Sequence, residues 1–428
     1  MGAFAPVRAE ERIASLDTLR GFALLGILLM NIVGFGLHSA YDNPLVAGGA
    51  EGPNLAAWVI MHILAEGKMR CLFSMVFGAG VILLTSRTDE RGASAQAADI
   101  FLRRNLWLML FGIVHAYLLW FGEILYPYGM CALVLFAFRR MPARTLILIG
   151  AVMLLGTAVA NAINGMTAMN TLQRGEQAEN LARKGAALTD EQEQVRGQRE
   201  EMIKQDHPTP AEVEKANRQW RGGVVDVLKI RGQIVWKWHN LAYYHVLHID
   251  LFSMMFLGMG FYKLGIFSAA RSTKFYLWLA LAGYCVGLSV NSFTAWTIVR
   301  SGFDLPTRLF CQTVYDVGRL SIALAHLGVL MILCQKGWLL FLLRPLTAIG
   351  QTAFSNYVFH SIVCSTLFTG IGFGLFGKLQ RYELYFVVLS IWLVQMVVSP
   401  IWLKHYRFGP LEWCWRSLTY WQKQPMRV

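Results

Sequence analysis

The sequence predicts an all-α, polytopic membrane protein, a helical bundle of about ten spans with a helical insertion on one face. Of its 428 residues, 55% are hydrophobic and only 15% are charged, against about 25% charged residues in an average soluble domain. Apolar runs of about 18 residues or more recur along the whole chain, the length that a helix needs to cross roughly 30 Å of hydrocarbon. The first run has no small-residue cleavage site after it, so we interpret it as a retained span and not as a signal peptide.

The apolar runs divide the chain into two membrane halves around a polar segment. Residues 1–164 hold five predicted spans, at about 16–37, 71–84, 105–121, 124–138 and 146–163. Residues 224–428 hold five more, at about 249–266, 275–297, 314–334, 346–368 and 384–403, followed by a basic tail. The stretch between them, 165–223, carries ten of the 26 acidic residues. It also contains two capping boxes, which begin at Thr189 and Thr209 and predict helix starts in a soluble insertion.

Basic residues are distributed in a way that predicts the orientation. The formal charge of +13 comes largely from Lys and Arg in alternate loops, so membrane topology explains it better than nucleic-acid binding. The positive-inside rule then places both termini in the cytoplasm and the insertion on the outer face.

The first span carries polar residues on one face. Arg20 and Asn31 are eleven residues apart, about three helical turns, so they share a face and are separated by about 16 Å along the axis. Asp17 lies one turn before Arg20 and is expected to pair with it. Either Asp17 and Arg20 anchor a helix end at the interface, or the face lines a polar interior that Asn31 reaches.

The third span contains His115, which suits general-base chemistry because imidazole titrates near neutrality. Glu123 follows about two turns later and is expected to orient an imidazole or to accept from a substrate amine. Lys68, at a charged break in the second apolar run, either extends to the interface or binds an anion. Other polar groups favour structural roles: Asp316 and Arg319 are expected to form an internal ion pair.

One histidine cluster invites a metal interpretation. His239, His245, His248 and Asp250 lie close together in the sequence, but neighbouring tryptophans suit an interfacial belt. Neither an HExxH nor a CxxC motif is present, so we expect no metal.

Five ordered strings resemble the YeiB-like family of bacterial inner-membrane proteins, long labelled a domain of unknown function. The first runs from Ser15-Leu-Asp17-Thr-Leu-Arg20-Gly21 to Asn31. The other four are Leu72-Phe-Ser-Met-Val-Phe77-Gly78-Ala-Gly80; His115 with Trp120-Phe-Gly122-Glu123-Ile-Leu; Gly350-Gln-Thr-Ala-Phe-Ser-Asn356-Tyr357; and Phe408-Gly409-Pro410-Leu-Glu412-Trp413-Cys-Trp415-Arg416. They cover nearly the whole chain. The resemblance implies a multi-pass protein of the bacterial inner membrane.

The first string also looks like the first helix of the transmembrane acyltransferase superfamily. The spacing from Arg20 to Asn31 matches heparan-α-glucosaminide N-acetyltransferase, whose catalytic histidine lies in the following loop. The histidine here is His38, but the His-x-x-Trp-x-Gly context of that enzyme is absent, so His115 becomes a rival base. Glu123 stands where relatives usually carry Asp.

The resemblance implies transfer of an acyl group, acetyl above all, from cytoplasmic acyl-CoA to an outer hydroxyl or amine. Arg20, Arg103 and Arg104 are expected to bind the CoA phosphates, with Asp17 and Lys68 beside the donor site. His115 or His38 acts as base, and Asn31 donates to the oxyanion. The acceptor is a sugar, a lipid or an envelope-linked group. The alternatives are an exporter of a small or lipid-linked molecule and a non-catalytic partner protein; homo-oligomerisation is left open.

Overall fold

The computed structural model describes residues 13–39, 43–90, 94–240 and 242–428; the side chains of 87–97 and 239–246 also lie outside the description. Across these ranges the ordered structure is helical, with one isolated β-bridge between Tyr406 and Arg427. The predicted all-α fold is therefore confirmed. In chain order the helices are α1 (Ala14–Gly36), α2 (Gly52–Leu64), α3 (Lys68–Glu90), α4 (Ser94–Leu118), α5 (Leu125–Leu135), η2 (Phe136–Phe138), α6 (Ala143–Arg183), α7 (Asp190–Asp206), α8 (Pro210–Trp220), α9 (Val224–Asn240), α10 (Ala242–Lys263), α11 (Thr273–Arg300), α12 (Leu305–Gln312), α13 (Tyr315–Lys336), α14 (Leu340–Gln351), α15 (Ala353–Phe368), α16 (Arg381–His405) and α17 (Pro410–Tyr420).

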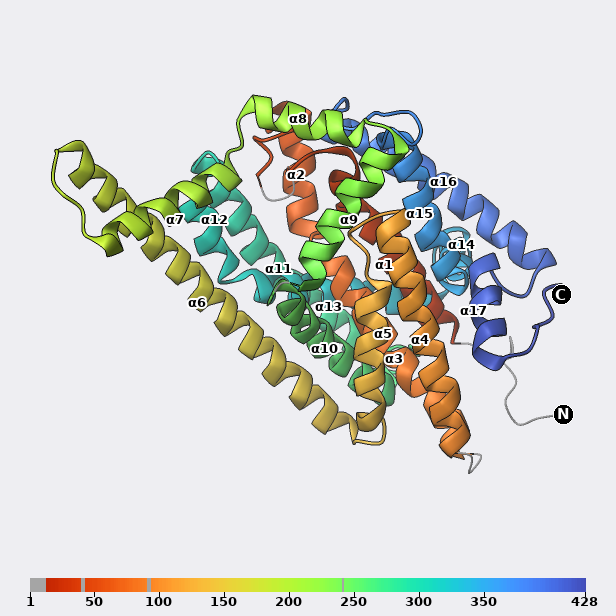
Figure 1. The fold of residues 1–428 in the computed structure, drawn as a ribbon. Helices are drawn as coiled ribbons and strands as arrows, with labels where there is room; N and C mark the ends of the chain where they lie inside the picture. The colour runs from red at the N-terminus through yellow and green to blue at the C-terminus, as the bar shows by residue number, and fades with distance from the viewer. Residues whose placement is uncertain (1–12, 40–42, 91–93, 241) are drawn as a thin grey trace.

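Six helical segments in the described ranges are long and apolar enough to cross a membrane: Ala14–Gly36, Gly52–Ser86, Ala143–Arg183, Thr273–Arg300, Tyr315–Lys336 and Arg381–His405. The chain is therefore a multi-pass membrane protein. The other predicted spans correspond to α4, α5, α10 and the α14–α15 pair, which pack among the six in one bundle (Figure 1).

Two predicted segments differ in their continuity. The span predicted at 346–368 is two helices, because α14 ends at Gln351 and α15 begins at Ala353. Thr352 stands between them with φ −113° and ψ 33°, outside the helical region. Conversely, the boundary predicted between 164 and 165 falls inside α6, which runs unbroken to Arg183. The apolar run ends where the membrane ends, whereas the helix continues because polar residues propagate it equally well in water.

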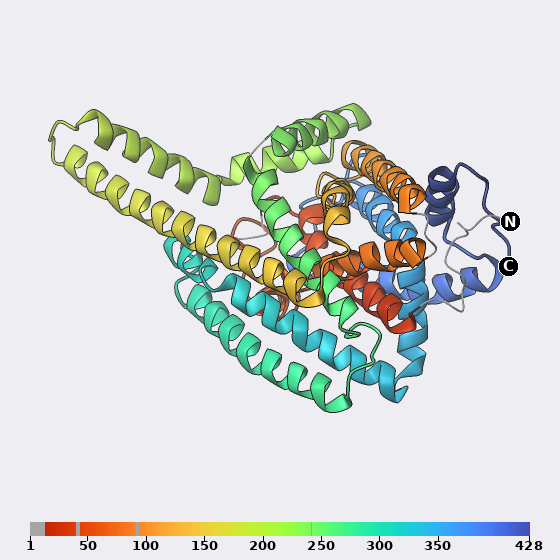
Figure 2. The same cartoon turned by 90° about the horizontal axis from the view of Figure 1, so that it is seen from below.

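The insertion extends away from the bundle as an arm formed by the end of α6 and the antiparallel α7 (Figures 1 and 2). Both predicted capping boxes are present, at Thr189 and Thr209. The arm is tied back at its base, where Arg308 of α12 pairs with Asp206. α8 then returns over the bundle, and Trp220 stacks on Phe376 with 5.5 Å between ring centroids.

Helix α1 crosses α14 with the two backbones in contact. An added Cβ on Gly21 would lie 2.0 Å from the carbonyl oxygen of Leu346, and one on Gly350 would lie 1.8 Å from that of Asp17. Gly78 of α3 faces α10 as closely, because its added Cβ would lie 2.1 Å from the carbonyl oxygen of Met255. Small residues permit this approach where the hydrophobic effect between helices is absent. These glycines, taken from three of the five strings, therefore set the helix crossings around the cavity described next.

Candidate functional site

A cavity of about 240 Å³ lies at the end of the bundle where α1 begins and α17 packs. Residues from all five strings line it, although the strings are spread over some 400 positions. The lining residues are Ile13, Leu16, Asp17, Arg20, Phe73, Val76, Phe77, Gly80, Val81, Leu83, Leu84, Phe101, Arg104, Asn105, Leu108, Ile124, Leu125, Tyr128, Ala132, Gly350, Gln351, Ala353, Phe354, Tyr357, Glu412, Trp415, Arg416 and Tyr420. The fold thus gathers the family-like strings at one site.

Three guanidinium groups mark one side of the cavity. Arg20 pairs with Asp17 at 2.6 Å, as predicted, and its Nη1 lies 3.3 Å from the Gly350 carbonyl oxygen. Arg104 lies within electrostatic range of both Arg20 and Arg416. Like charges repel at this range, so the cluster is arranged to favour an anion among the three side chains.

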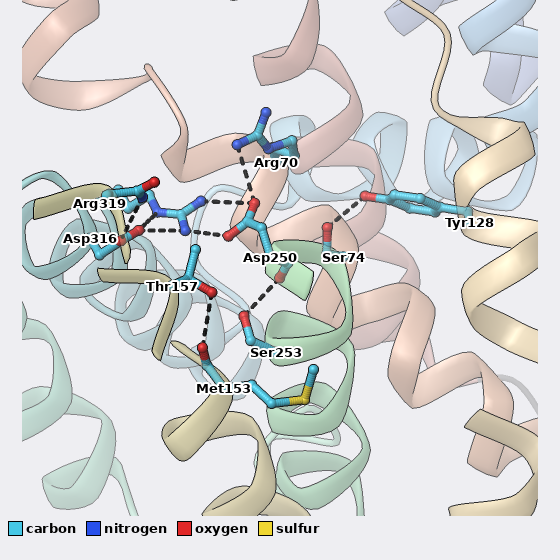
Figure 3. A network of polar contacts seen from close by, with 10 residues as sticks. Arg70, Ser74, Tyr128, Met153, Thr157, Asp250, Ser253, Asp316 and Arg319 are labelled. Atoms are coloured by element: carbon cyan, nitrogen blue, oxygen red, sulfur yellow. Dashed lines mark hydrogen bonds and ion pairs between the residues drawn. The ribbon is translucent and has the colours of Figure 1, made fainter. Parts of the chain in front are cut away.

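The remaining walls are apolar and come mainly from α3, α4 and α5. Gly80 borders open space in the cavity wall, because a Cβ added there would meet no atom within 4 Å. On one wall, the Tyr128 hydroxyl lies 2.6 Å from Ser74 Oγ; Figure 3 marks this hydrogen bond. The cavity therefore combines a cationic end with space for an apolar group, the two features of an amphiphilic anion.

Glu412 of α17 fixes the helix break beside the cavity. Its Oε1 accepts from the backbone N–H groups of Phe354 and Ser355, at 2.6 and 3.1 Å. A carboxylate at the N-terminus of α15 satisfies free donors and complements the helix dipole. Burial raises the pKa of Glu412, and these hydrogen bonds oppose the rise.

His115 lies next to the cavity but does not line it. Its ring centroid is 5.1 Å from that of Tyr357, which does line it. His115 is 2% exposed, and its Nε2 lies 2.7 Å from Ser361 Oγ. Nδ1 is buried without a hydrogen-bond partner among the described residues, so one ring nitrogen makes no hydrogen bond in the described structure.

Glu123 does not contact His115 through any hydrogen bond found in the described residues. Its carboxylate instead accepts from the backbone N–H groups of Leu125 and Tyr126, at 2.7 and 2.9 Å, and so caps α5. Burial in this turn raises the pKa of Glu123 to about 7.

The other predicted site residues are dispersed. Asn31 and His38 are half-buried near the far end of α1, and neither lines the cavity; burial lowers the pKa of His38. Arg103 pairs with the exposed Asp99 at 2.7 Å, away from the cavity. Lys68 is fully buried at the α2–α3 break, where its Nζ donates to the carbonyl oxygen of His62 at 2.5 Å. Lys68 therefore complements the C-terminal dipole of α2.

The histidine cluster that was weighed as a metal site lies partly outside the described side chains. Side chains of His239 and His245 lie outside the description, and the described residues hold no group of three metal-binding side chains. Asp250 is engaged elsewhere: it pairs with Arg319 and with Arg70, while Arg319 also pairs with Asp316 as predicted (Figure 3).

Sequence reasoning missed several cavity residues: Tyr128, Tyr357, Glu412, Trp415 and Arg416. Four of them lie in the fourth and fifth strings, so the family resemblance already marked the segments that contain them. The basic tail was attributed to topology, because nothing local indicates that α17 packs back against α4 and α15.

The comparisons with known proteins agree with the strings. Residues 261–422 match a family model described as "Protein of unknown function (DUF418)". The uncharacterized protein YxaH of Bacillus subtilis is 27% identical over 100% of this chain and 98% of its own length. The uncharacterized protein YeiB of Escherichia coli is 27% identical over 96% of both chains. These matches agree with the resemblance inferred from the five strings: over nearly its whole length the chain is similar to YeiB-like proteins.

Proposed function

We propose that this protein is a membrane-embedded acyltransferase that takes its acyl group from acyl-CoA bound in the cavity. The observation that carries the proposal is the cavity itself, with three arginines at one end and apolar walls beyond them. Acyl-CoA has this division, with phosphates at one end and an acyl thioester at the other. Arginine forks match phosphate oxygens, so Arg20, Arg104 and Arg416 are the proposed phosphate-binding groups.

The proposed reaction transfers the acyl group to a hydroxyl or amine. His115 takes the proton of the acceptor, whose oxygen or nitrogen attacks the thioester carbonyl carbon. The C–S bond then breaks, and the CoA thiolate leaves and takes up a proton. His115 is preferred over His38 because it contacts Tyr357 of the cavity wall. The proposed acceptor is a sugar, lipid or envelope-linked molecule on the outer side.

The proposed setting is the bacterial inner membrane with both termini in the cytoplasm. The Lys/Arg bias of the loops supports this orientation. The arginine end of the cavity, beside the start of α1 and the tail helix α17, would then face cytoplasmic acyl-CoA.

We would test the proposal by measuring the binding and the hydrolysis of acetyl-CoA and a series of longer acyl-CoAs with purified protein in detergent. Gly80→Leu adds a side chain to the cavity wall at a position where no atom lies within 4 Å of an added Cβ. We expect it to reduce acyl-CoA affinity at least tenfold without loss of the folded state. Gly156→Leu is the matched control, because Gly156 is an exposed helical glycine that also meets no atom within 4 Å.

Two further variants separate binding from chemistry. His115→Ala is expected to abolish hydrolysis while acyl-CoA still binds, whereas Arg20→Gln weakens binding. If well-folded protein binds no acyl-CoA, or if Gly80→Leu and wild type bind equally, the proposal is wrong. Full activity in both His115→Ala and His38→Ala would contradict the assigned base.

A transporter is the second candidate, and the helix break between α2 and α3 is the observation that favours it. Discontinuous helices at membrane depth are typical of substrate and ion sites in secondary transporters. An exporter of a lipid-linked anion would bind it in the same cavity without cleaving a thioester. Acyl-CoA hydrolysis that depends on His115 distinguishes the enzyme from the exporter.

A further inference from the structure

The break between α2 and α3 brings a carboxylate, an imidazole and a hydroxyl into one hydrogen-bonded row. Glu66 Oε2 lies 3.1 Å from Nδ1 of His62, and Nε2 of His62 lies 2.9 Å from Oγ1 of Thr294 on α11. α2 is 13 residues long, so its end lies about 20 Å along the helix axis from its start. The break also lies within Gly52–Ser86, one of the six segments long and apolar enough to cross a membrane, and ionisable groups inside such segments usually serve a function.

Both ring nitrogens of His62 keep a hydrogen-bond partner whether the imidazole is neutral or carries an extra proton. In the protonated state both ring nitrogens donate, to Glu66 and to Thr294, and the Thr294 hydroxyl donates to the Asn291 carbonyl oxygen 3.0 Å away. In the neutral state Nδ1–H still donates to Glu66. The Thr294 hydroxyl then rotates to donate to Nε2. Neither state leaves a ring nitrogen unpaired, so the two states differ only by one proton and one hydroxyl rotation.

From this geometry we propose that His62, Glu66 and Thr294 form a proton-binding site at the α2–α3 break. The Trp58 ring stacks on the imidazole, with centroids 4.9 Å apart and an interplanar angle of 17°. An indole face attracts a cation, so this contact favours the imidazolium. The His62 and Glu66 side chains are 12% and 21% exposed, so neither is completely enclosed by the protein.

Charged and titratable groups of the neighbouring helices interact electrostatically with this site. The cationic groups that act electrostatically on Glu66 are Lys68 and Arg70 of α3 and Arg381 of α16. The titratable phenols beside it are Tyr315 of α13 and Tyr385 of α16.

Trp58 supplies a local optical reporter, because an imidazolium quenches the fluorescence of an indole that it contacts. We would titrate detergent-purified protein from pH 4 to 9 and subtract the signal of Trp58→Phe from that of the wild type. The expected difference is a one-proton transition that His62→Gln abolishes. Glu66→Gln should move its midpoint down by about one unit or more, because the imidazolium loses its counter-charge. His207→Gln, in the outer insertion, is the control and should change nothing.

Thr294→Val keeps the test decisive if a His62 or Glu66 variant does not fold. Valine is nearly isosteric but accepts no hydrogen bond, so the midpoint should again fall. A flat difference signal, or the same transition in Thr294→Val and His62→Gln as in wild type, overturns the proposal. The fluorescence titration does not depend on acyl-CoA binding, so its failure would not contradict the proposed transferase, and failure of the transferase would not contradict this inference.

Discussion

Arg104 and Trp415 hold each other through two separate contacts. The Arg104 guanidinium lies 3.7 Å from the centroid of the Trp415 ring, and the indole Nε1 donates to the Arg104 backbone carbonyl oxygen at 2.7 Å. α17 is therefore attached to α4 at the residue whose side chain contributes to the cationic end of the cavity. The tail helix orients a cavity arginine as well as closing the bundle.

Replacing Trp415 with Leu should weaken the binding of acyl-CoA by about tenfold or more. A partly desolvated cation–π contact contributes about 2 kcal/mol, and each 1.4 kcal/mol is about a tenfold change in affinity. Binding isotherms of wild type and variant give the measurement. Trp278→Leu is the control, since Trp278 is 71% exposed on α11 and is not among the residues that line the cavity. Equal affinities in wild type and Trp415→Leu would show that the stacking does not position Arg104.

The sequence predicted the helical fold well because hydrocarbon imposes a length and a polarity on each span. The Asp17–Arg20 and Asp316–Arg319 pairs also followed from helical spacing, since both partners lie one turn apart. Contacts between distant segments did not follow. No local pattern indicates that Glu412 caps α15, or that Lys68 caps α2.

A similar limit applies to the glycines of the strings. The sequence shows where Gly21 and Gly350 stand, but only the crossing of α1 and α14 shows why a side chain is excluded there. Gly80, which has the same residue type and the same helical setting, instead borders open space. The distinction depends on which helix faces each glycine, and helix neighbours are decided by the packing of the whole bundle.

Gly350→Ala should therefore destabilise the protein strongly, because its Cβ would lie 1.8 Å from the Asp17 carbonyl oxygen. α1 and α14 would have to separate, at a cost of about 1–3 kcal/mol or more. The apparent melting temperature in detergent measures the effect. Gly156→Ala is the matched substitution without a neighbour and should leave the temperature unchanged or slightly higher. A Gly350→Ala protein as stable as wild type would contradict the close crossing.

Glu123 should make stability depend on pH. Burial raises the pKa of Glu123 in the folded protein to about 7, whereas an unfolded glutamate titrates near 4.3. The folded state thus binds more protons between these values, so its stability falls as pH rises from about 4 to 7 and is flat above that range. A difference of two to three pH units between the folded and unfolded pKa values corresponds to about 3–4 kcal/mol of stability at most.

Glu123→Gln removes this dependence because glutamine does not ionise in the range. Melting temperatures of wild type and Glu123→Gln from pH 4.5 to 8 should converge or cross, with the wild type losing more as pH rises. Glu193→Gln, on the exposed arm, controls for the general effect of removing a carboxylate. Parallel pH curves for wild type and Glu123→Gln would show that Glu123 is ionised throughout.

Arg319→Met should be among the most destabilising single changes in the bundle. Arg319 is 2% exposed and pairs with both Asp250 and Asp316, while Arg70 adds a second, longer bond to Asp250 at 3.2 Å. Loss of the Arg319 guanidinium leaves the buried carboxylates of Asp250 and Asp316 with Arg70 as their remaining arginine. Breaking a buried ion pair on one side typically costs about 3–5 kcal/mol.

The double variant Arg319→Met/Asp316→Asn should recover part of that loss, because it removes the carboxylate that has lost its cation. The recovery, measured as the non-additive part of a double-mutant cycle in melting temperature, reports the coupling between the two residues. Arg300→Met, at the exposed end of α11, should be nearly neutral by comparison. Additive losses in the double variant would mean that the carboxylate of Asp316 is stabilised by groups other than Arg319, and the network would then have to be reassigned around Asp250 and Arg70.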